Sequence, residues 1–135
     1  MASRVTLLAD TSAWVEYLRG TGSPTSQILK RHLADDALMT TDVVVMEILA
    51  GARDDAHESA LATLLSLSLS VPVERVDWVD AARLQRRCRA GGETVRRLPD
   101  CLIAAVAIRA DVEVLHCDRD FDTLARHTAL RTLTA

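Results

Sequence analysis

The sequence lacks a long apolar run and has few cysteines. No window approaches the ~20 apolar residues of a membrane-spanning helix, and no N-terminal apolar stretch is long enough for a signal peptide. The three cysteines are odd in number, widely spaced and without a CxxC pair, which argues against a disulfide framework. We therefore expect a soluble protein of the reducing cytoplasm that makes no contact with a membrane.

The chain also has little positive charge. Lys30 is the only lysine and the formal net charge is −3, so a polyanion would have to meet a local basic patch or a bound cation. One short segment is rich in arginine, and its members are Arg83, Arg86, Arg87, Arg89, Arg96 and Arg97. This pattern fits either a solvated helix face followed by a loop or a surface that contacts phosphates, and both interpretations stay open.

Nearly half of the 135 residues (49%) are apolar, enough for a single domain over residues 1–135 without a disulfide or a structural metal. Apolar segments predict short buried strands at 5–9, 37–40 and 112–116. The segments 69–73 and 130–133 predict strands at the edges of the sheet. Helical patterns lie between them, at 11–19, 24–34, 42–50, 54–67, 78–90, 99–110 and 120–127. This alternation predicts an α/β fold, a three-layer α/β/α sandwich with a central parallel sheet of four to five short strands.

Acidic residues follow the predicted strands. Asp10 comes directly after the first strand, Glu47 about one turn into the helix after the second, and Asp118 just after the strand at 112–116. Because ligand sites of parallel sheets form outside the carboxyl ends of the strands, these side chains should approach one edge, with Asp120 behind them. Asp100 begins a helix before the last core strand, and the pattern leaves its place relative to that edge open.

Each acid also has a purely structural interpretation. Asp10 and Asp118 could cap helices, and Asp100 could interact with a helix dipole. We expect Thr11 to cap the first helix, which would free Asp10 to face a cleft. Ser12 could either cap the helix or orient a bound water.

Two of the acids lie in unusually apolar helices. Glu47 lies in VVVMEILAG, a helix that should have no solvated face, and Asp100 begins the equally apolar DCLIAAVAI. An unpaired carboxylate in such surroundings is costly, so we expect these acids to line a cleft and to meet a cation.

A divalent metal is the expected cation. Carboxylates that share a cleft repel one another, no lysine lies nearby in the sequence, and oxygen-only ligation suits Mg²⁺ or Mn²⁺ better than zinc. The histidines show no HxxxH or HExxH spacing. Among them, only His116, two residues before Asp118, is a candidate neighbour of the site.

Four segments, in a fixed order, carry a resemblance to a known family: LADTSAWVEYL, TTDVVVMEILAG, RLPDCLIAAVAI and VLHCDRDFDTLA. Together they resemble the PIN-domain ribonucleases, and specifically the VapC-type toxins of bacterial type II toxin–antitoxin modules, over essentially the whole chain. The resemblance implies a metal-dependent endoribonuclease with Mg²⁺ or Mn²⁺ as cofactor and RNA as substrate. It further implies a homodimer and a cognate antitoxin protein that blocks the active site.

The resemblance also assigns residues. The family's four catalytic and metal-binding acids fall on Asp10, Glu47, Asp100 and Asp118. Asp120 matches a frequent additional acid and metal ligand, and Ser12 matches a polar position that assists at the pocket. His116 stands where many members carry threonine, which affects a minor hydroxyl contact rather than the metal site.

The expected reaction is metal-assisted hydrolysis of RNA phosphodiester bonds that leaves 5′-phosphate and 3′-hydroxyl ends. Ser12, Arg96 and Arg97 are the expected substrate-binding residues, although the two arginines also fit an ordinary surface loop. A PIN-domain nuclease of RNA processing without an antitoxin, and a non-catalytic interaction module on the same fold, are the alternatives. A receiver domain and an aspartyl phosphatase fit poorly, because the late lysine of the first and the DxDxT motif of the second are missing.

Overall fold

The computed structural model describes residues 5–133 and contains a parallel sheet. Its strands are short: β1 (Leu7–Ala9), β2 (Leu38–Thr41), β3 (Leu69–Val71), β4 (Glu113–Leu115) and β5 (Thr132–Leu133). They pair in the order β3-β2-β1-β4-β5, and every pair is parallel. The strands β3 and β5 therefore lie at the edges, as predicted, and the central strand β1 is buried along its whole length.

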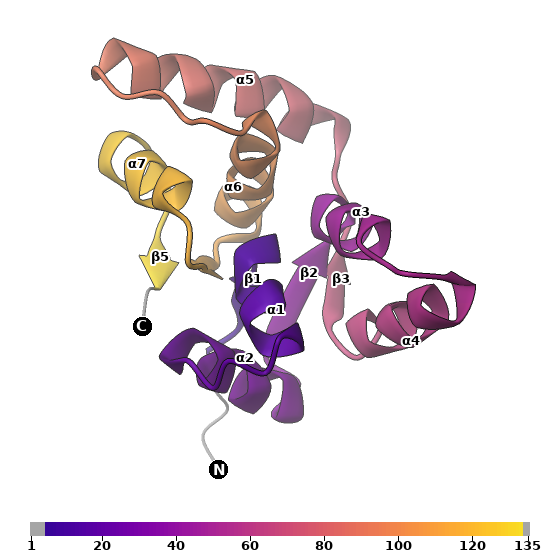
Figure 1. The fold of residues 1–135 in the computed structure, drawn as a ribbon. Coiled ribbons are helices and arrows are strands. Elements are labelled where there is room, and N and C mark those ends of the chain that lie inside the picture. The colour runs from indigo at the N-terminus through magenta and orange to yellow at the C-terminus, as the bar shows by residue number, and fades with distance from the viewer. Residues whose placement is uncertain (1–4, 134–135) are drawn as a thin grey trace.

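Seven helices connect or flank the strands within residues 5–133: α1 (Thr11–Leu18), α2 (Pro24–Ala34), α3 (Asp42–Ala50), α4 (Asp55–Leu65), α5 (Arg75–Ala90), α6 (Leu98–Ala110) and α7 (Arg119–His127). The chain runs from β1 through β2 to β3 and then returns to β4 and β5 on the other side of β1. Because parallel crossovers are right-handed, α1 to α4 cover one face of the sheet and α5 to α7 the other (Figure 1). The predicted three-layer α/β/α sandwich is confirmed.

Local signals in the sequence set several helix ends. Ser23 caps α2 ahead of Pro24, and Asp54 caps α4 by accepting the backbone N–H of His57 at 2.7 Å. At the end of α6, Asp111 takes a left-handed conformation with φ of 57°, which turns the chain toward β4. None of the helices in this described range is long and apolar enough to cross a membrane.

The helix α5 begins earlier than the sequence pattern predicts. It begins at Arg75 rather than Trp78, because Glu74 and Asp77 form a capping box in which each side chain accepts the backbone N–H of the other. The box places Trp78 at the end of the first turn, on the outer side of the helix, where the residue is 63% exposed.

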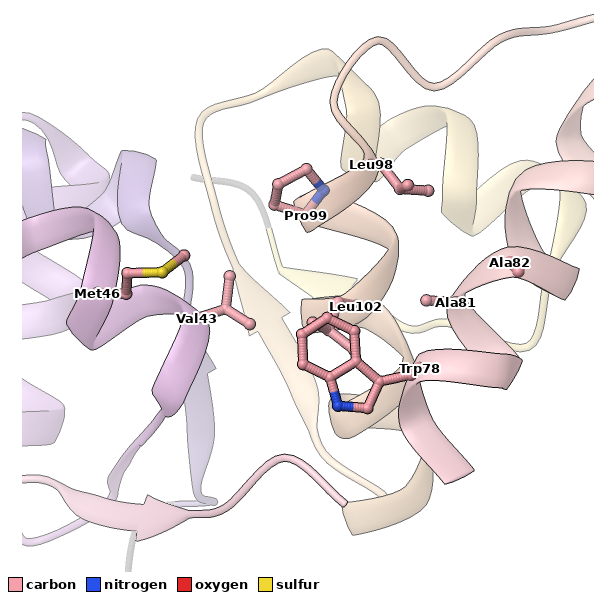
Figure 2. Close-up of a pocket in the computed structure, with 8 residues that line it drawn as sticks. All are labelled: Val43, Met46, Trp78, Ala81, Ala82, Leu98, Pro99 and Leu102. Atoms are coloured by element: carbon pink, nitrogen blue, oxygen red, sulfur yellow. The ribbon is translucent and has the colours of Figure 1, made fainter. Parts of the chain in front are cut away.

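An apolar groove lies between α3, α5 and α6 (Figure 2). It has a volume of about 220 Å³, and Met46, Trp78 and Leu98 on its border are exposed. Met46 belongs to α3 and is 61% exposed, so the expectation that this helix has no solvent-facing side is wrong. The helix lies at the margin of the sandwich, and only part of its circumference packs against the core.

The strands β1 and β4 lie side by side where the strand order reverses. Ala9 pairs with Leu115, so Asp10 and the residues after β4 leave the sheet at the same edge. The crevice at such a reversal is the usual ligand site of an open parallel sheet. The fold therefore positions the strand-end acids where a site is expected.

Candidate active site

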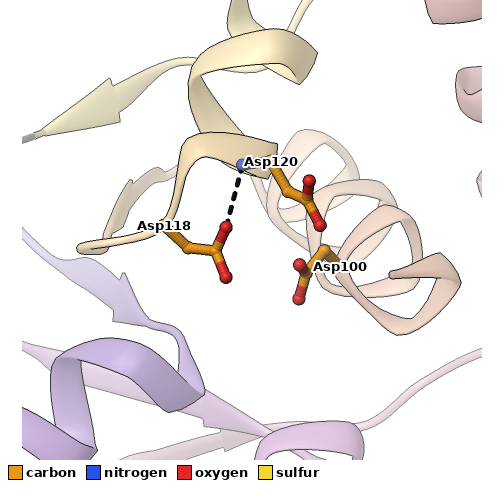
Figure 3. Close-up of side chains that lie close together, drawn as sticks. All are labelled: Asp100, Asp118 and Asp120. Atoms are coloured by element: carbon orange, nitrogen blue, oxygen red, sulfur yellow. Dashed lines mark hydrogen bonds between the residues drawn. The ribbon is translucent and has the colours of Figure 1, made fainter. Parts of the chain in front are cut away.

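Three aspartates meet beside the carboxyl end of β4 (Figure 3). Asp118 caps α7, Asp120 lies in the first turn of α7, and Asp100 lies in the first turn of α6. One carboxylate oxygen of each lies within 4.8 Å of the others. Asp100 and Asp120 are buried and Asp118 is partly exposed, so the cluster opens to solvent through Asp118.

Asp10 approaches the cluster from the end of β1. Its buried carboxylate accepts the backbone N–H of Ala13 at 2.9 Å and the hydroxyl of Ser12 at 2.8 Å, so Asp10 itself caps α1. The expectation that Thr11 caps this helix is wrong, because Thr11 is already its first helical residue. The negative charge of Asp118 acts to raise the pKa of Asp10, so the two carboxylates interact. The Asp10 side chain therefore both caps α1 and belongs to the acidic site.

Ser12 connects the ends of β1 and β4. Its hydroxyl donates to Asp10 and accepts the backbone N–H of Cys117 at 2.8 Å. Because Cys117 directly precedes Asp118, this bridge fixes the two acidic turns relative to each other. The structure thus gives Ser12 a positioning role, and a contact with substrate stays a prediction.

Glu47 lies on α3 and is outside the three-aspartate cluster. Its side chain is 12% exposed, accepts the hydroxyl of Thr11 at 2.6 Å and pairs with the guanidinium of Arg97. Thr11 is therefore a residue of the site that the sequence reasoning missed. A hydroxyl after a strand-end acid was the one available signal, and it is equally typical of a helix cap.

Arg96 and Arg97 bring positive charge to the acids. Arg96 lies 3.0 Å from Asp118 and 3.3 Å from Asp120, and Arg97 pairs with Glu47. The backbone N–H groups of both arginines also donate to Asp120, each at 3.0 Å, so this carboxylate orders the loop before α6. The sequence analysis found no lysine near the acids and expected these two arginines to bind substrate, whereas in the structure their guanidinium groups pair with the acids themselves.

Burial changes the pKa values of the acids. It raises the pKa of Asp100 to about 8, together with the hydrogen bond that only the protonated carboxyl can donate to Asp120 and the charge of Asp118. It also raises the pKa of Asp10 to about 6, against the hydrogen bonds that this carboxylate accepts. Burial acts on Asp120 in the same direction, but its bonds to Asp100 and to the loop backbone lower its pKa overall. Full ionisation of the cluster at neutral pH therefore requires a cation.

The donor set fits a hard divalent cation. Asp100 Oδ2 is buried and has no hydrogen-bond partner within residues 5–133. It belongs to a cluster that offers only carboxylate oxygens, which are the ligands that Mg²⁺ and Mn²⁺ prefer. A bound cation would give this oxygen a partner and would remove the repulsion among the aspartates.

His116 supports the site from the interior. Its imidazole is 1% exposed, packs beside the ring of Phe121, and accepts the backbone N–H of Asp118 through Nδ1 at 3.1 Å. Burial lowers its pKa, so the ring is neutral at pH 7. The prediction that His116 neighbours the site is confirmed, and its observed role is to hold the Asp118 turn.

Comparison with known proteins identifies the family. Residues 7–127 match the family described as PIN domain. The chain is 44% identical over 128 residues to ribonuclease VapC11 of Mycobacterium tuberculosis. The aligned region covers 93% of this chain and 96% of the relative. The chain belongs to the VapC ribonucleases of the PIN domain family. The resemblance noted in its four sequence segments is thereby confirmed.

Solved structures share this PIN domain fold at low sequence identity. One such structure is VapBC2 from Rickettsia felis, bound to a DNA fragment from its promoter. A chain of that complex matches with a TM-score of 0.76 and 14% sequence identity, and the match covers 96% of this chain and 98% of that one. VapC20 of Mycobacterium tuberculosis, described as a toxin that cleaves the sarcin-ricin loop, has a TM-score of 0.67 and 20% identity, covering 93% and 99%. These likenesses support the α/β/α architecture.

Proposed function

We propose that this VapC-family protein is a metal-dependent endoribonuclease and the toxin of a type II toxin–antitoxin pair. The observation that carries the proposal is the unpartnered, buried oxygen of Asp100 inside a cluster of aspartates. The 44% identical relative is named a ribonuclease, and the VapC20 neighbour is described as an RNA-loop-cleaving toxin. RNA is the substrate in this proposal, and the expected products carry 5′-phosphate and 3′-hydroxyl ends.

The acids have different roles in the proposed reaction. Asp10, Asp100 and Asp118 would hold Mg²⁺ or Mn²⁺, which lowers the pKa of a water and neutralises phosphate charge when bound. Asp120 already uses both oxygens to accept the backbone N–H groups of the loop before α6, so it mainly orders the site. Glu47, held by a hydroxyl and a guanidinium, completes the acidic set from α3.

In this proposal, Arg96 and Arg97 first pair with the acids of the site and then with RNA phosphates. Without a metal, their guanidinium groups neutralise Asp118, Asp120 and Glu47. A divalent cation competes for the same carboxylates, so metal binding would release the guanidinium groups toward RNA phosphates. Both side chains are about half exposed and have room to turn outward.

Cleavage assays with aspartate-to-asparagine variants test this function. The wild-type protein should cleave RNA with Mg²⁺ or Mn²⁺ and lose cleavage in EDTA, and Asp10→Asn and Asp118→Asn should each lower the rate at least about 100-fold. Asparagine caps a helix as well as aspartate does, so these variants should keep α1 and α7. Asp54→Asn, at the exposed cap of α4, is the matched control and should keep full activity. Undiminished cleavage by the site variants, or cleavage in EDTA, would contradict the proposal.

A second groove offers a place for the antitoxin. It lies between α1, α3 and α4, has a volume of about 380 Å³, and includes Glu47 and Thr11 of the site. A partner segment with apolar side chains seated there would block access to the acids. Leu18→Glu should therefore weaken inhibition by the antitoxin while preserving RNA cleavage. Val79→Glu, also at an exposed apolar residue but outside this groove, should leave inhibition unchanged. Equal inhibition of both variants would place the antitoxin elsewhere.

The apolar groove beside Trp78 suits a second copy of the chain. An isologous interface needs a protruding group and a complementary depression on the same surface, and Trp78 borders such a depression (Figure 2). A homodimer would cover the exposed Met46, Trp78 and Leu98 at once. Trp78→Glu should convert the dimer to a monomer in light scattering, and an unchanged mass would contradict this assignment. The three free thiols suit the cytoplasm as the place where this assembly works.

A further inference from the structure

Positive charge is concentrated in one segment of the chain. Residues 83–97 contain six arginines and one glutamate, a net charge of +5, which leaves −8 on the remaining sequence. The first four of these arginines lie on the last two turns of α5 and are exposed, and the last two lie in the loop at the acidic site. A chain that is acidic overall therefore presents one strongly basic helix end.

Three arginines of α5 form one surface, which we call the arginine face: Arg83, Arg86 and Arg87. With Ala90 they line a hollow of about 390 Å³, as their spacing of three and four residues brings them to one side of the helix. Arg83 pairs with Asp80 at 3.2 Å, while Arg86 and Arg87 have no ion-pair partner within the described part of the chain. Like charges at this spacing repel, so the arrangement costs stability unless an anion is bound.

The helix dipole explains only part of this charge. A basic side chain is favoured in the last turn of a helix, where Arg87 and Arg89 lie. Arg83 and Arg86 lie before that turn, and the dipole effect falls off beyond it. The arginine face therefore exceeds what capping of α5 requires.

The lining of this hollow distinguishes it from the groove at the other end of α5. The groove beside Trp78 is lined by apolar side chains, whereas the hollow is lined by three guanidinium groups and Ala90. Protein–protein interfaces place apolar and aromatic anchors at their centre, and the hollow has no such anchor. Guanidinium groups are the preferred partners of phosphates.

The arginine face is linked to the acidic site across α7. The ring of His127 lies so close to Gly91 that a Cβ there would approach it to 2.3 Å, so the end of α7 packs on the end of α5. Glu93 holds Arg126 of α7 at 2.6 Å. Beyond this contact, a hollow of about 200 Å³ includes Arg96, Arg119, Arg126 and Asp120 of the aspartate cluster. Glu93 also lines this hollow, so arginines and paired carboxylates alternate between the end of α5 and the site.

We infer that the arginine face of α5 binds the sugar–phosphate backbone of RNA at a distance from the cleaved bond. This inference rests on the proposed ribonuclease function and extends it, because it assigns a second contact for the part of the substrate outside the acidic pocket. Arg86 and Arg87 contact phosphates without reading sequence. They raise the affinity for long RNA and leave the chemistry at the aspartates unchanged.

Binding measurements at several salt concentrations test the inference. The protein carries Asp100→Asn to prevent cleavage, and the probe is a fluorescein-labelled, unstructured RNA of about 30 nucleotides followed by anisotropy. Loss of two phosphate contacts in Arg86→Gln/Arg87→Gln should weaken binding about tenfold near 0.1 M KCl and reduce the salt slope by about 1.4. The matched control is Lys30→Gln/Arg31→Gln on α2, which removes the same charge from the opposite layer and should stay within about twofold of the parent.

Cleavage of a tetranucleotide by proteins with an intact Asp100 separates this inference from the proposed function. Arg86→Gln/Arg87→Gln should cleave the tetranucleotide at the wild-type rate, because so short a substrate does not reach α5. If the wild type cleaves no RNA, the proposed function fails, while the salt slopes still test the arginine face. The inference is overturned if both double variants weaken RNA binding equally, or if neither does. It is also overturned if the α5 variant loses only the antitoxin complex.

Discussion

Two buried aspartates of this chain occupy the same helical position and differ in the partners of their carboxylates. Asp77 is the third residue of α5 and Asp100 the third residue of α6, and they are 0% and 2% exposed. Asp77 receives the guanidinium of Arg109 at 2.8 Å and the backbone N–H of Glu74 at 2.8 Å. Asp100 has a buried oxygen without a hydrogen-bond partner among the described residues.

The pKa values of the two carboxyls move in opposite directions. Burial acts to raise the pKa of Asp77, but the bonds from Arg109 and Glu74 outweigh it, so the pKa is lowered. Burial raises the pKa of Asp100 to about 8. The difference teaches that burial alone does not mark a functional acid. A buried carboxylate without a hydrogen-bond partner does mark a functional acid, because the free-energy cost of burying it must be offset by a ligand.

The largest expected effect is on catalysis at Asp100. Asp100→Asn should lower RNA cleavage at least about 100-fold with Mg²⁺, because it removes a metal ligand. In EDTA at neutral pH its melting temperature should equal or exceed that of the wild type, since asparagine is uncharged and removes the cost of keeping this buried carboxyl protonated. A clear loss of melting temperature in EDTA would show that Asp100, like Asp77, has a structural role.

The same substitution at Asp77 should have the reverse outcome. Asp77→Asn leaves the guanidinium of Arg109 without its buried counter-charge, and the free energy of unfolding should fall by about 2–4 kcal/mol. For a chain of this length, that corresponds to a drop of roughly 10 °C in melting temperature. Cleavage per folded molecule at 20 °C should stay near the wild-type rate. If Asp77→Asn is stable but inactive, Asp77 has a functional role and the contrast with Asp100 is wrong.

The pH dependence of stability should separate the two acids in metal-free protein. The folded state holds a proton on Asp100 that the unfolded state releases above its usual pKa of 3.8, so stability should fall as pH rises from about 4 to about 8. Asp77 has a lowered pKa, so its contribution is present above its usual value of 3.8 and is lost in acid below it. Denaturant unfolding should show that Asp100→Asn flattens the alkaline limb and Asp77→Asn the acid limb. Identical profiles for both variants would contradict these directions.

A smaller effect is expected from the arginines that accompany each site. Arg109 is a permanent partner of Asp77, whereas Arg97 should give up Glu47 when a metal binds. Arg97→Gln should therefore raise the affinity for Mn²⁺ about threefold and lower the affinity for RNA by a similar factor. Arg53→Gln, which removes an arginine from the lining of the groove that contains Glu47, is the matched control. Unchanged Mn²⁺ affinity in Arg97→Gln would show that this arginine does not compete with the metal.

The sequence predicts the sheet and the strand-end acids well. Apolar runs, caps and glycine stops indicated alternating strands and helices, and parallel topology brought Asp10 and Asp118 to one edge. Periodicity could not show how helix ends pack in three dimensions. The place of Asp100 came from the family resemblance, and the Thr11–Glu47 bond and the pairing of Arg97 with Glu47 became visible only in the structure. These contacts join segments that are 36 and 50 residues apart, where no local pattern specifies a partner.

Titration calorimetry with Mn²⁺ at about pH 7.5 tests the central claim most directly. If the aspartate cluster is a metal centre, the wild type and Asp77→Asn should bind Mn²⁺ with similar affinity and release protons on binding, because the metal displaces the proton that the raised pKa keeps on Asp100. Asp100→Asn should lose both the binding and the proton release. Equal Mn²⁺ binding by Asp100→Asn and the wild type would contradict the account.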